Sequence, residues 1–286
     1  MISKNELAKI VGKENVSDAK DVLLKYSSDH SLVPPGVPEF VVYPTSSEQV
    51  SEVLILANKN NVPVVPVSSQ IHFNGGAIPK EGGIVMDLSK MNKILEIDED
   101  LKKVRIEAGV TWEQLTGELK KKGMRALMPF LPPGNRSVLS DFLDREVPTN
   151  TVYDYGEPMQ GFEVVWPTGD AFRMGSASVD GYPDSGSHGG NPSGPGLDFY
   201  RFVQGAQGTM GVATWTNLKV MFETAKDKVF FVPVDDLTYI QEFLYRILPR
   251  RVGQEVVLLN RTDLAAIIAE SFPADFDKLR ATLPPW

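Results

Sequence analysis

The sequence has no cysteine and only three histidines, His30, His72 and His188, among its 286 residues. Without thiols, this chain cannot supply a disulfide, a thiolate-bound iron–sulfur cluster or a cysteine nucleophile. The three histidines are widely separated and do not have the spacing of zinc ligands. The sequence therefore predicts no metal centre, and His30 and His188 are interpreted as loop residues without catalytic chemistry.

Long apolar runs and an excess of positive charge are also missing. No segment approaches the roughly 18 apolar residues of a membrane-spanning helix, and the first ten residues do not resemble a signal peptide. The net charge is −8, and no basic run is longer than Lys120–Lys122. We therefore expect a cytoplasmic protein with no membrane span and no nucleic-acid partner.

What is present is an ordinary globular composition, with 42% hydrophobic and 23% charged residues. Apolar spacing and capping residues predict helices at 3–12, 16–26, 46–59, 111–119, 236–248 and 262–271. Alternating apolar residues predict strands at 41–43, 62–67, 84–87, 91–97, 102–108, 162–166, 171–174, 212–221, 229–234 and 255–259. The composition changes at residues 223–228, so we expect a second domain to begin near residue 225.

Three segments could bind a ligand. The loop after strand 62–67 carries Ser, Gln, His and Asn side chains and a glycine pair, which could hold a ligand or form an ordinary surface turn. Residues 129–161 form a long irregular segment of the kind that is functional or mobile in compact domains. Glycines 205, 208 and 211 allow close approach of the backbone to a ligand, or simply tight turns. No glycine fingerprint of a nicotinamide dinucleotide fold is present, which argues against a nicotinamide dehydrogenase.

Blocks in these segments resemble the flavin-binding domain of the vanillyl-alcohol oxidase / p-cresol methylhydroxylase family. The similar blocks are residues 38–115, with NGGAIP and GGIVMDLSKMNKILEID, residues 137–170, with SVLSDFLDR and YGEPMQGFEVVWPTGD, and residues 202–221, FVQGAQGTMGVATWTNLKVM. The resemblance implies an α+β fold with a PCMH-type FAD-binding domain of two α+β subdomains at residues 1–224, including N-terminal helices in 1–34. It also implies that residues 225–286 are part of a cap or substrate domain, the start of an α/β cap domain.

The resemblance implies FAD as the cofactor, bound noncovalently in preference to a covalent bond through His72. The implied cofactor-binding residues are Ser68, Ser69, Gln70, Ile71, His72, Asn74 and Gly75 at the diphosphate, Val110 and Thr111 near the adenosine or diphosphate, Pro133, Gly134, Ser137 and Val138 along the ribityl chain and ring, Ser140 and Asp141 near the phosphates, and Gly208, Gly211 and Val212 at the adenine end.

The sequence departs from the family pattern in two places. Ser69, Gln70 and Ile71 stand where the family usually has glycines, so their side chains are expected to narrow the groove. Ser140 and Asp141 stand where many relatives have a glycine and an asparagine, and a carboxylate at Asp141 is expected to repel phosphate.

Two residues are candidates for catalysis. In aryl-alcohol oxidases of the family, an aspartate follows a Tyr-Gly pair near the flavin, and here Tyr155-Gly156 is followed by Glu157. A carboxylate at this place could assist hydride transfer to the flavin or accept a proton. The alternative is that Glu157 is a solvated loop residue.

The resemblance leads to two hypotheses about function. In the first, the chain is the FAD-binding subunit of an oxidoreductase that transfers hydride from an alcohol, a hydroxy acid or a phenol to FAD. Members of the family are longer, so a second protein chain is expected to supply the cap or to accept electrons. In the alternative, the chain is a non-catalytic scaffold or assembly subunit that keeps the fold but has lost flavin chemistry. The sequence does not indicate the substrate or the electron acceptor.

Overall fold

A computed structural model describes residues 2–69, 71–146, 148–149, 158–174, 200–234, 236–250 and 252–284. The candidate residues Gln70, Tyr155 and Glu157 lie outside these ranges. The chain divides into a larger unit, Met1–Pro148 with Glu157–Glu223, and a C-terminal unit, Thr149–Gly156 with Thr224–Trp286. In the described ranges, no helix combines the length and the apolar character needed to cross a membrane.

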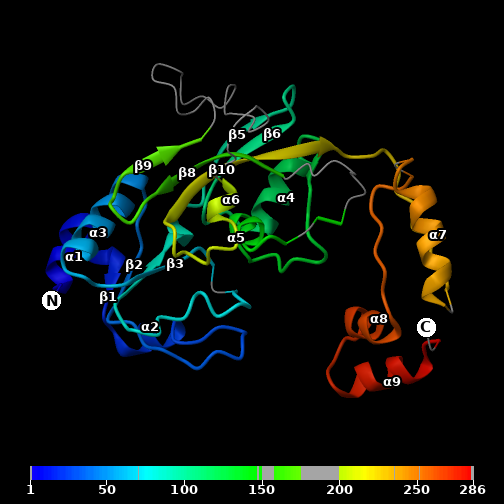
Figure 1. The fold of residues 1–286 in the computed structure, drawn as a ribbon, viewed down its shortest axis with the longest axis horizontal. Helices are drawn as coiled ribbons and strands as arrows, with labels where there is room; N and C mark the ends of the chain where they lie inside the picture. Colours follow the sequence, from blue (N-terminus) through cyan, green and yellow to red (C-terminus); the bar gives the residue numbers. More distant parts are fainter. Residues whose placement is uncertain are drawn as a thin grey trace. The chain divides into compact units, whose positions relative to one another are not determined.

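The first half of the larger unit forms a small mixed sheet with helices (Figure 1). Its elements are α1 (Lys4–Val11), β1 (Val16–Ser17), α2 (Lys20–Lys25), β2 (Phe40–Val42), α3 (Ser47–Lys59), β3 (Val64–Val67) and β4 (Ile84–Asp87). The strand order is β1-β2-β4-β3, with β2 and β3 both parallel to β4. The predicted strands are confirmed, but β1 and α2 together replace the single helix predicted at residues 16–26.

Helix α3 shows why the helix predictions succeed. The Ser46 side chain accepts a hydrogen bond from the backbone N–H of Gln49, and the Gln49 side chain accepts one from the N–H of Thr45 at 2.8 Å. These bonds satisfy donors that a helix start otherwise leaves without partners. The predicted apolar stripe of α3 is buried, and α3 packs against α1.

The second half of the larger unit is an antiparallel sheet organised around its longest strand. Its elements are β5 (Ile94–Asp98), β6 (Lys103–Glu107), α4 (Trp112–Lys120), β7 (Met124–Ala126), α5 (Val138–Leu143), β8 (Met159–Val165), β9 (Ala171–Arg173), α6 (Tyr200–Val203) and β10 (Val212–Phe222). The strand order is β5-β6-β10-β8-β9, and β7 pairs with the end of β10. The α+β fold with two subdomains that the sequence predicts is thereby present, although β7, α5 and α6 were not predicted individually.

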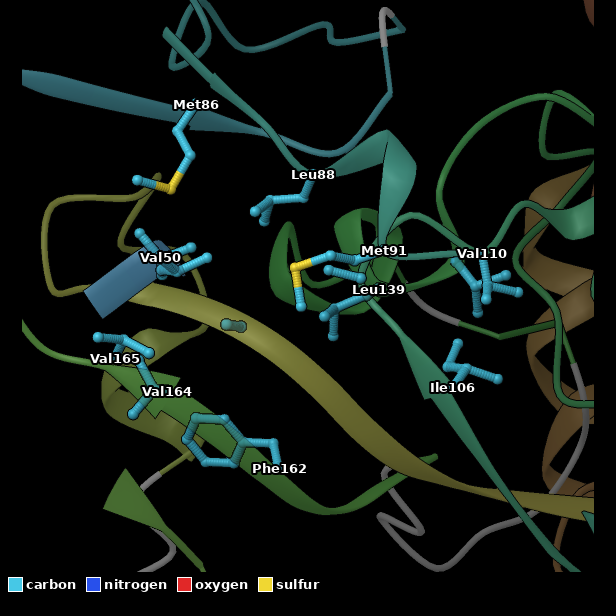
Figure 2. Close-up of a cluster of buried hydrophobic side chains, with 14 of the residues drawn as sticks. Val50, Met86, Leu88, Met91, Ile106, Val110, Leu139, Phe162, Val164 and Val165 are labelled. Atoms are coloured by element: carbon cyan, nitrogen blue, oxygen red, sulfur yellow. The ribbon is translucent and has the colours of Figure 1, made fainter. Parts of the chain in front are cut away.

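One hydrophobic core joins these two halves. In Figure 2, Val50 of α3 lies near Val164 of β8, and Met86 of β4, Leu139 of α5 and Phe162 of β8 belong to the same cluster. Four of these five side chains are completely buried, and Leu139 is 1% exposed. The short helix α5 is therefore fixed by its own contribution to the core, and this matters because α5 forms one wall of the pocket described below.

The C-terminal unit contains α7 (Leu237–Ile247), α8 (Arg261–Ile268) and α9 (Ala274–Thr282), and α8 packs against α9. The two predicted helices are confirmed. The strands predicted at residues 229–234 and 255–259 are wrong: these residues are irregular apart from a single bridging residue, Glu255. A strand needs a neighbouring strand for its backbone hydrogen bonds, whereas a helix satisfies them internally. The side chains of Phe230 and Phe231 have relative exposures of 80% and 81%. The apolar pattern of residues 229–234 therefore does not reflect burial within this unit.

Candidate cofactor-binding site

A pocket with a cavity volume of about 90 Å³ lies within the larger unit, where three segments meet. These segments are the loop after β3, helix α5 and the glycine-bearing turn before β10. Seven of the predicted cofactor-binding residues line the pocket: Ser68, His72, Asn74, Ser140, Gly208, Gly211 and Val212. The structure therefore brings together residues from all three segments that the sequence singled out.

The other described candidates do not line this pocket: Ser69, Ile71, Gly75, Val110, Thr111, Pro133, Gly134, Ser137, Val138 and Asp141. Some of them support its wall instead. The Ser137 hydroxyl donates to the carbonyl of Ala108 at 2.7 Å and accepts from the backbone N–H of Ser140 at 3.2 Å. Thr111 accepts from the N–H of Gln114 at 3.3 Å and begins α4. As ligand contacts, these residues stay predictions.

Glycine lets the pocket walls approach one another closely. A Cβ atom on Gly76 would lie 2.9 Å from the Cβ of Gln207, and one on Gly208 would lie 2.7 Å from the Cγ of Pro66. Gly208 also has a φ of +79°, a conformation that other residues rarely adopt. The two glycine-bearing turns thus converge on one pocket, and side chains at these positions would force them apart.

The loop after β3 is held from outside by the segment at residues 27–36. The carboxylate of Asp29 accepts the backbone N–H of Gly75 at 2.8 Å, and the N–H of His30 donates to the carbonyl of His72 at 2.9 Å. The N–H of Gly75, predicted to bind phosphate, is therefore already engaged. In contrast, the backbone N–H groups of Asn74 and Gly76 donate no hydrogen bond within the described part of the chain.

Two hydroxyl groups join opposite walls of the pocket. Ser68 Oγ and Ser140 Oγ lie 2.6 Å apart and share a hydrogen bond, either atom being the donor. The neighbouring Ser69 Oγ is buried and has no hydrogen-bond partner among the described residues. Buried hydroxyl groups are normally paired, so Ser69 is a candidate for a contact to a ligand.

A buried arginine, which sequence analysis missed, organises the far side of α5. The guanidinium of Arg136 lies 2.6 Å from Asp141 Oδ1 and 2.8 Å from Asp144 Oδ2, and it stacks over the ring of Phe73. Trp112 Nε1 donates to the other oxygen of Asp141. The Asp141 carboxylate therefore contacts Arg136 and Trp112 and does not line the pocket, and its expected repulsion of phosphate stays a prediction.

The pocket itself is weakly charged. Burial raises the pKa of Asp144, which lines the pocket, to about 6 against the opposing effect of Arg136. Burial lowers the pKa of His72, whose Nε2 contacts the carbonyl of Ser69, so the imidazole is neutral at pH 7. Among the described residues that line the pocket, none is lysine or arginine. An anionic ligand here would be held by N–H and O–H groups without a full positive charge.

These features suit the oxygen atoms of a phosphate group. The glycines permit close contact with the backbone, the backbone N–H groups of Asn74 and Gly76 donate no hydrogen bond within the described residues, and the hydroxyls of Ser68 and Ser140 line the wall. Backbone and hydroxyl donors of this kind can hold phosphate without lysine.

Comparisons with known proteins agree with this interpretation. Residues 38–175 match the family model described as "FAD binding domain". The chain is 28% identical over 228 residues to the glycolate oxidase subunit GlcD of Bacillus subtilis, covering 76% of this chain and 44% of that protein. It is 26% identical over 281 residues to the 4-cresol dehydrogenase [hydroxylating] flavoprotein subunit of Pseudomonas putida, covering 96% and 53%. The chain spans about half the length of the curated relatives it matches.

Solved structures give the same fold. The structure of p-cresol methylhydroxylase with substrate bound superposes with a TM-score of 0.78 at 24% identity, covering 97% of this chain and 57% of that one. The 4-ethylphenol oxidase from Gulosibacter chungangensis gives a TM-score of 0.66 at 21% identity, covering 78% and 43%. Residues 38–175 therefore match an FAD-binding domain, and the chain is similar in sequence and fold to flavoproteins that contain one, which supports FAD as the cofactor.

Proposed function

We propose that this chain is the FAD-binding part of a flavin-dependent oxidoreductase that removes hydride from an alcohol, a hydroxy acid or a phenol. The observation that carries the proposal is the convergence of two glycine-bearing turns on one pocket inside a domain of the FAD-binding family. The names of the relatives, a glycolate oxidase subunit, a D-lactate dehydrogenase and a 4-cresol dehydrogenase subunit, support these substrate classes.

Bound FAD supplies the hydride acceptor, and the protein supplies binding, orientation and electrostatics. In this proposal, the N–H groups of Asn74 and Gly76 and the hydroxyl of Ser69 bind the diphosphate. The apolar side chains of Leu88 and Leu139 in the pocket wall exclude water from the cofactor. The pair Tyr155 and Glu157 is proposed to act at the substrate, with the Glu157 carboxylate accepting its proton.

We also propose that residues 1–224 form the FAD-binding domain and that residues 225–286 are part of a cap or substrate domain. The division of the structure after Glu223 supports this boundary. The exposed aromatic side chains of Phe230 and Phe231 support contact of the C-terminal unit with further polypeptide, which a partner chain could supply. One relative is itself named a flavoprotein subunit, which is consistent with a multi-subunit enzyme. A cytoplasmic location stays a prediction.

The proposal is tested by purifying the protein and recording its visible spectrum before and after adding FAD. A bound flavin spectrum that bleaches anaerobically with glycolate, D-lactate or 4-cresol would support it, and the substrate that bleaches it identifies the class. Glu157→Gln should then bind FAD normally but bleach much more slowly. A protein that stays colourless with excess FAD would contradict the proposal.

The alternative function is a non-catalytic scaffold that has kept the fold. Two hydrogen bonds favour this alternative: the one between the hydroxyls of Ser68 and Ser140, and the one from the Gly75 N–H to the Asp29 carboxylate. Both engage hydrogen-bonding groups near the pocket. The same spectrum separates the two functions, because a scaffold would not retain FAD.

A further inference from the structure

We propose that Tyr26 is a positioning residue for the cofactor pocket. Its hydrogen bond to Asp87 fixes the segment at residues 27–36, and that segment in turn keeps the loop after β3 in the shape that binds FAD. The part of this inference that concerns affinity rests on the proposed FAD-binding function. Tyr26 does not line the pocket, so its effect reaches the cofactor only through the intervening segment.

The small sheet of the larger unit has a second buried face, opposite the main core. Side chains alternate between the two faces of a strand. In β4, Met86 belongs to the main core, whereas Val85 joins Val41, Val67 and Tyr26 in a separate, smaller cluster. Tyr26 directly follows α2, so the end of α2 is attached to the sheet through this small cluster.

One buried carboxylate lies on the same face. Asp87 ends β4 and is 2% exposed. Its Oδ2 accepts a hydrogen bond from the Tyr26 hydroxyl at 2.5 Å, and its Oδ1 accepts one from the backbone N–H of Ser89 at 2.8 Å. The Tyr43 hydroxyl lies 3.2 Å from that of Tyr26. Hydrogen bonds to an ionised oxygen are the strong ones, and a buried carboxylate requires them, so the Tyr26–Asp87 bond fixes the end of α2 on β4.

The segment that contacts the loop after β3 begins directly after Tyr26 and returns to the same place. The backbone N–H of Gly36 donates to the carbonyl of Ser27 at 2.9 Å, which closes the segment at its base. Near that base, the carboxylate of Asp29 accepts the N–H of Gly75 at 2.8 Å. A displacement of Tyr26 therefore also displaces the carboxylate that holds the loop.

The held loop carries residues of the pocket wall. His72, whose carbonyl accepts the N–H of His30, and Asn74, which precedes Gly75, both line the pocket. A loop that is ordered before its ligand arrives loses less entropy on binding. Loosening the contact of Tyr26 should therefore weaken FAD binding although no contact to FAD is removed.

A purely structural role for Tyr26 makes a different prediction. Loss of its hydrogen bond would then lower the stability of the larger unit and leave the loop after β3 unchanged in the folded protein. The inference also predicts how two changes combine. Because Tyr26→Phe and Asp29→Ala would act through the same segment, their effects on FAD affinity should be less than multiplicative.

The test compares the unchanged protein with Tyr26→Phe, which removes the hydroxyl and keeps the ring in its cluster. Amide hydrogen exchange of the FAD-free protein, followed by mass spectrometry, should become several-fold faster at residues 27–36 and also at residues 71–76. Calorimetry should show FAD binding that is weaker on the order of fivefold. The double variant Tyr26→Phe/Asp29→Ala should bind FAD within about twofold of Asp29→Ala alone.

Glu163→Gln, which alters a buried hydrogen-bonded carboxylate elsewhere in the larger unit, is the control. It should lower stability but leave exchange at residues 71–76 and FAD affinity unchanged. Circular dichroism checks that every variant is folded, and Asp87→Asn gives an independent result if Tyr26→Phe is not.

Exchange at residues 71–76 that Tyr26→Phe leaves unchanged, or effects of Tyr26→Phe and Asp29→Ala that multiply, would overturn the inference and leave the proposed function intact. Failure of the unchanged protein to bind FAD would overturn the proposed function, and the exchange rates would still decide whether Tyr26 holds the loop.

Discussion

At the scale of single residues, the most heavily bonded buried charge is the carboxylate of Glu163 in β8, which is 1% exposed. It accepts hydrogen bonds from Ser47 at 2.5 Å, Arg173 at 2.6 Å and Thr214 at 2.7 Å. Burial alone would raise the pKa of Glu163, but these bonds outweigh it and hold the pKa below its usual value. One side chain thus ties α3, β9 and β10 to β8.

We therefore predict that Glu163→Gln lowers the free energy of unfolding by about 2 kcal/mol at pH 7. Because the pKa is lower in the folded state, the stabilisation is present above the unfolded value of about 4.3 and is lost as the pH falls through the folded value. Urea denaturation at pH 7 and in acid measures the difference, which should shrink in acid. The exposed Glu118 pairs with Lys121, and Glu118→Gln should change stability by well under 1 kcal/mol. A difference for Glu163→Gln that is the same at both pH values would contradict the prediction.

Asp144 leads to a second prediction at this scale. Its pKa of about 6 means that it becomes charged between pH 5 and 7, next to the proposed diphosphate site. FAD should therefore bind more tightly at pH 5 than at pH 7, on the order of fivefold, since a neighbouring charge costs roughly 1 kcal/mol at a solvated site. Asp144→Asn should remove most of this dependence. If FAD titrations gave the same pH dependence in this variant, Asp144 would not be responsible.

The resemblance predicted Ser68, His72 and Gly208 as cofactor-binding residues. The structure brings all three to one pocket, and their contact with a cofactor stays a prediction. Arg136 was missed because its role depends on Asp141 and Asp144 folding back onto it, which no local pattern shows. For the same reason, no local pattern indicated that the Asp141 carboxylate is paired with Arg136.

At the scale of elements, the segment at residues 27–36 holds the loop after β3 in place. Its contacts are the Asp29–Gly75 and His30–His72 hydrogen bonds, and Val33 packs so close to Gly75 that an added Cβ would lie 2.4 Å from it. A loop fixed from outside can present its backbone N–H groups to a ligand without first becoming ordered.

Asp29→Ala should therefore loosen this loop. We expect faster amide hydrogen exchange at residues 71–76 and several-fold weaker FAD binding, because the loss of one charge-assisted bond costs about 1–3 kcal/mol locally. Exchange monitored by mass spectrometry checks this. Asp18→Ala, which removes an exposed partner of Lys4, is the control and should leave exchange in the loop unchanged. Unaltered protection in Asp29→Ala would show that the segment does not hold the loop.

Helices with capping residues and long alternating strands could be predicted from sequence, whereas short elements could not. α5 has six residues and β7 has three, too few for a periodic pattern. The strands predicted at 229–234 and 255–259 had the right composition but no neighbouring strand, which composition cannot reveal.

At the scale of the whole molecule, the two units differ in how well they bury their apolar residues. The larger unit has a main core that joins both sheets, whereas Phe230 and Phe231 of the C-terminal unit have relative exposures of 80% and 81%. Exposed apolar groups of this size usually mark an interface. The resemblance to longer proteins predicted a second protein chain that supplies the cap, and this stays a prediction.

The double variant Phe230→Ser/Phe231→Ser should therefore associate less with itself while binding FAD normally, because the pocket lies entirely in the larger unit. Light scattering and FAD titration measure the two effects. Phe162→Ser, which places a hydroxyl in the core, should instead unfold the protein by losing roughly 3–5 kcal/mol. If the double variant bound FAD more weakly, FAD binding would depend on the C-terminal unit as well as on the larger unit, and the prediction would be contradicted.

The most direct test of the central claim, that two glycine turns of this chain converge on FAD, is a calorimetric titration of the protein and of Gly208→Ala with FAD. Gly208 has a φ of +79°, and an added Cβ would lie 2.7 Å from Pro66. We predict that the unchanged protein binds one FAD per chain and that Gly208→Ala binds it at least tenfold more weakly, since about 1.4 kcal/mol of strain or displacement suffices for this. No binding by the unchanged protein, or equal binding by a folded Gly208→Ala, would contradict the claim.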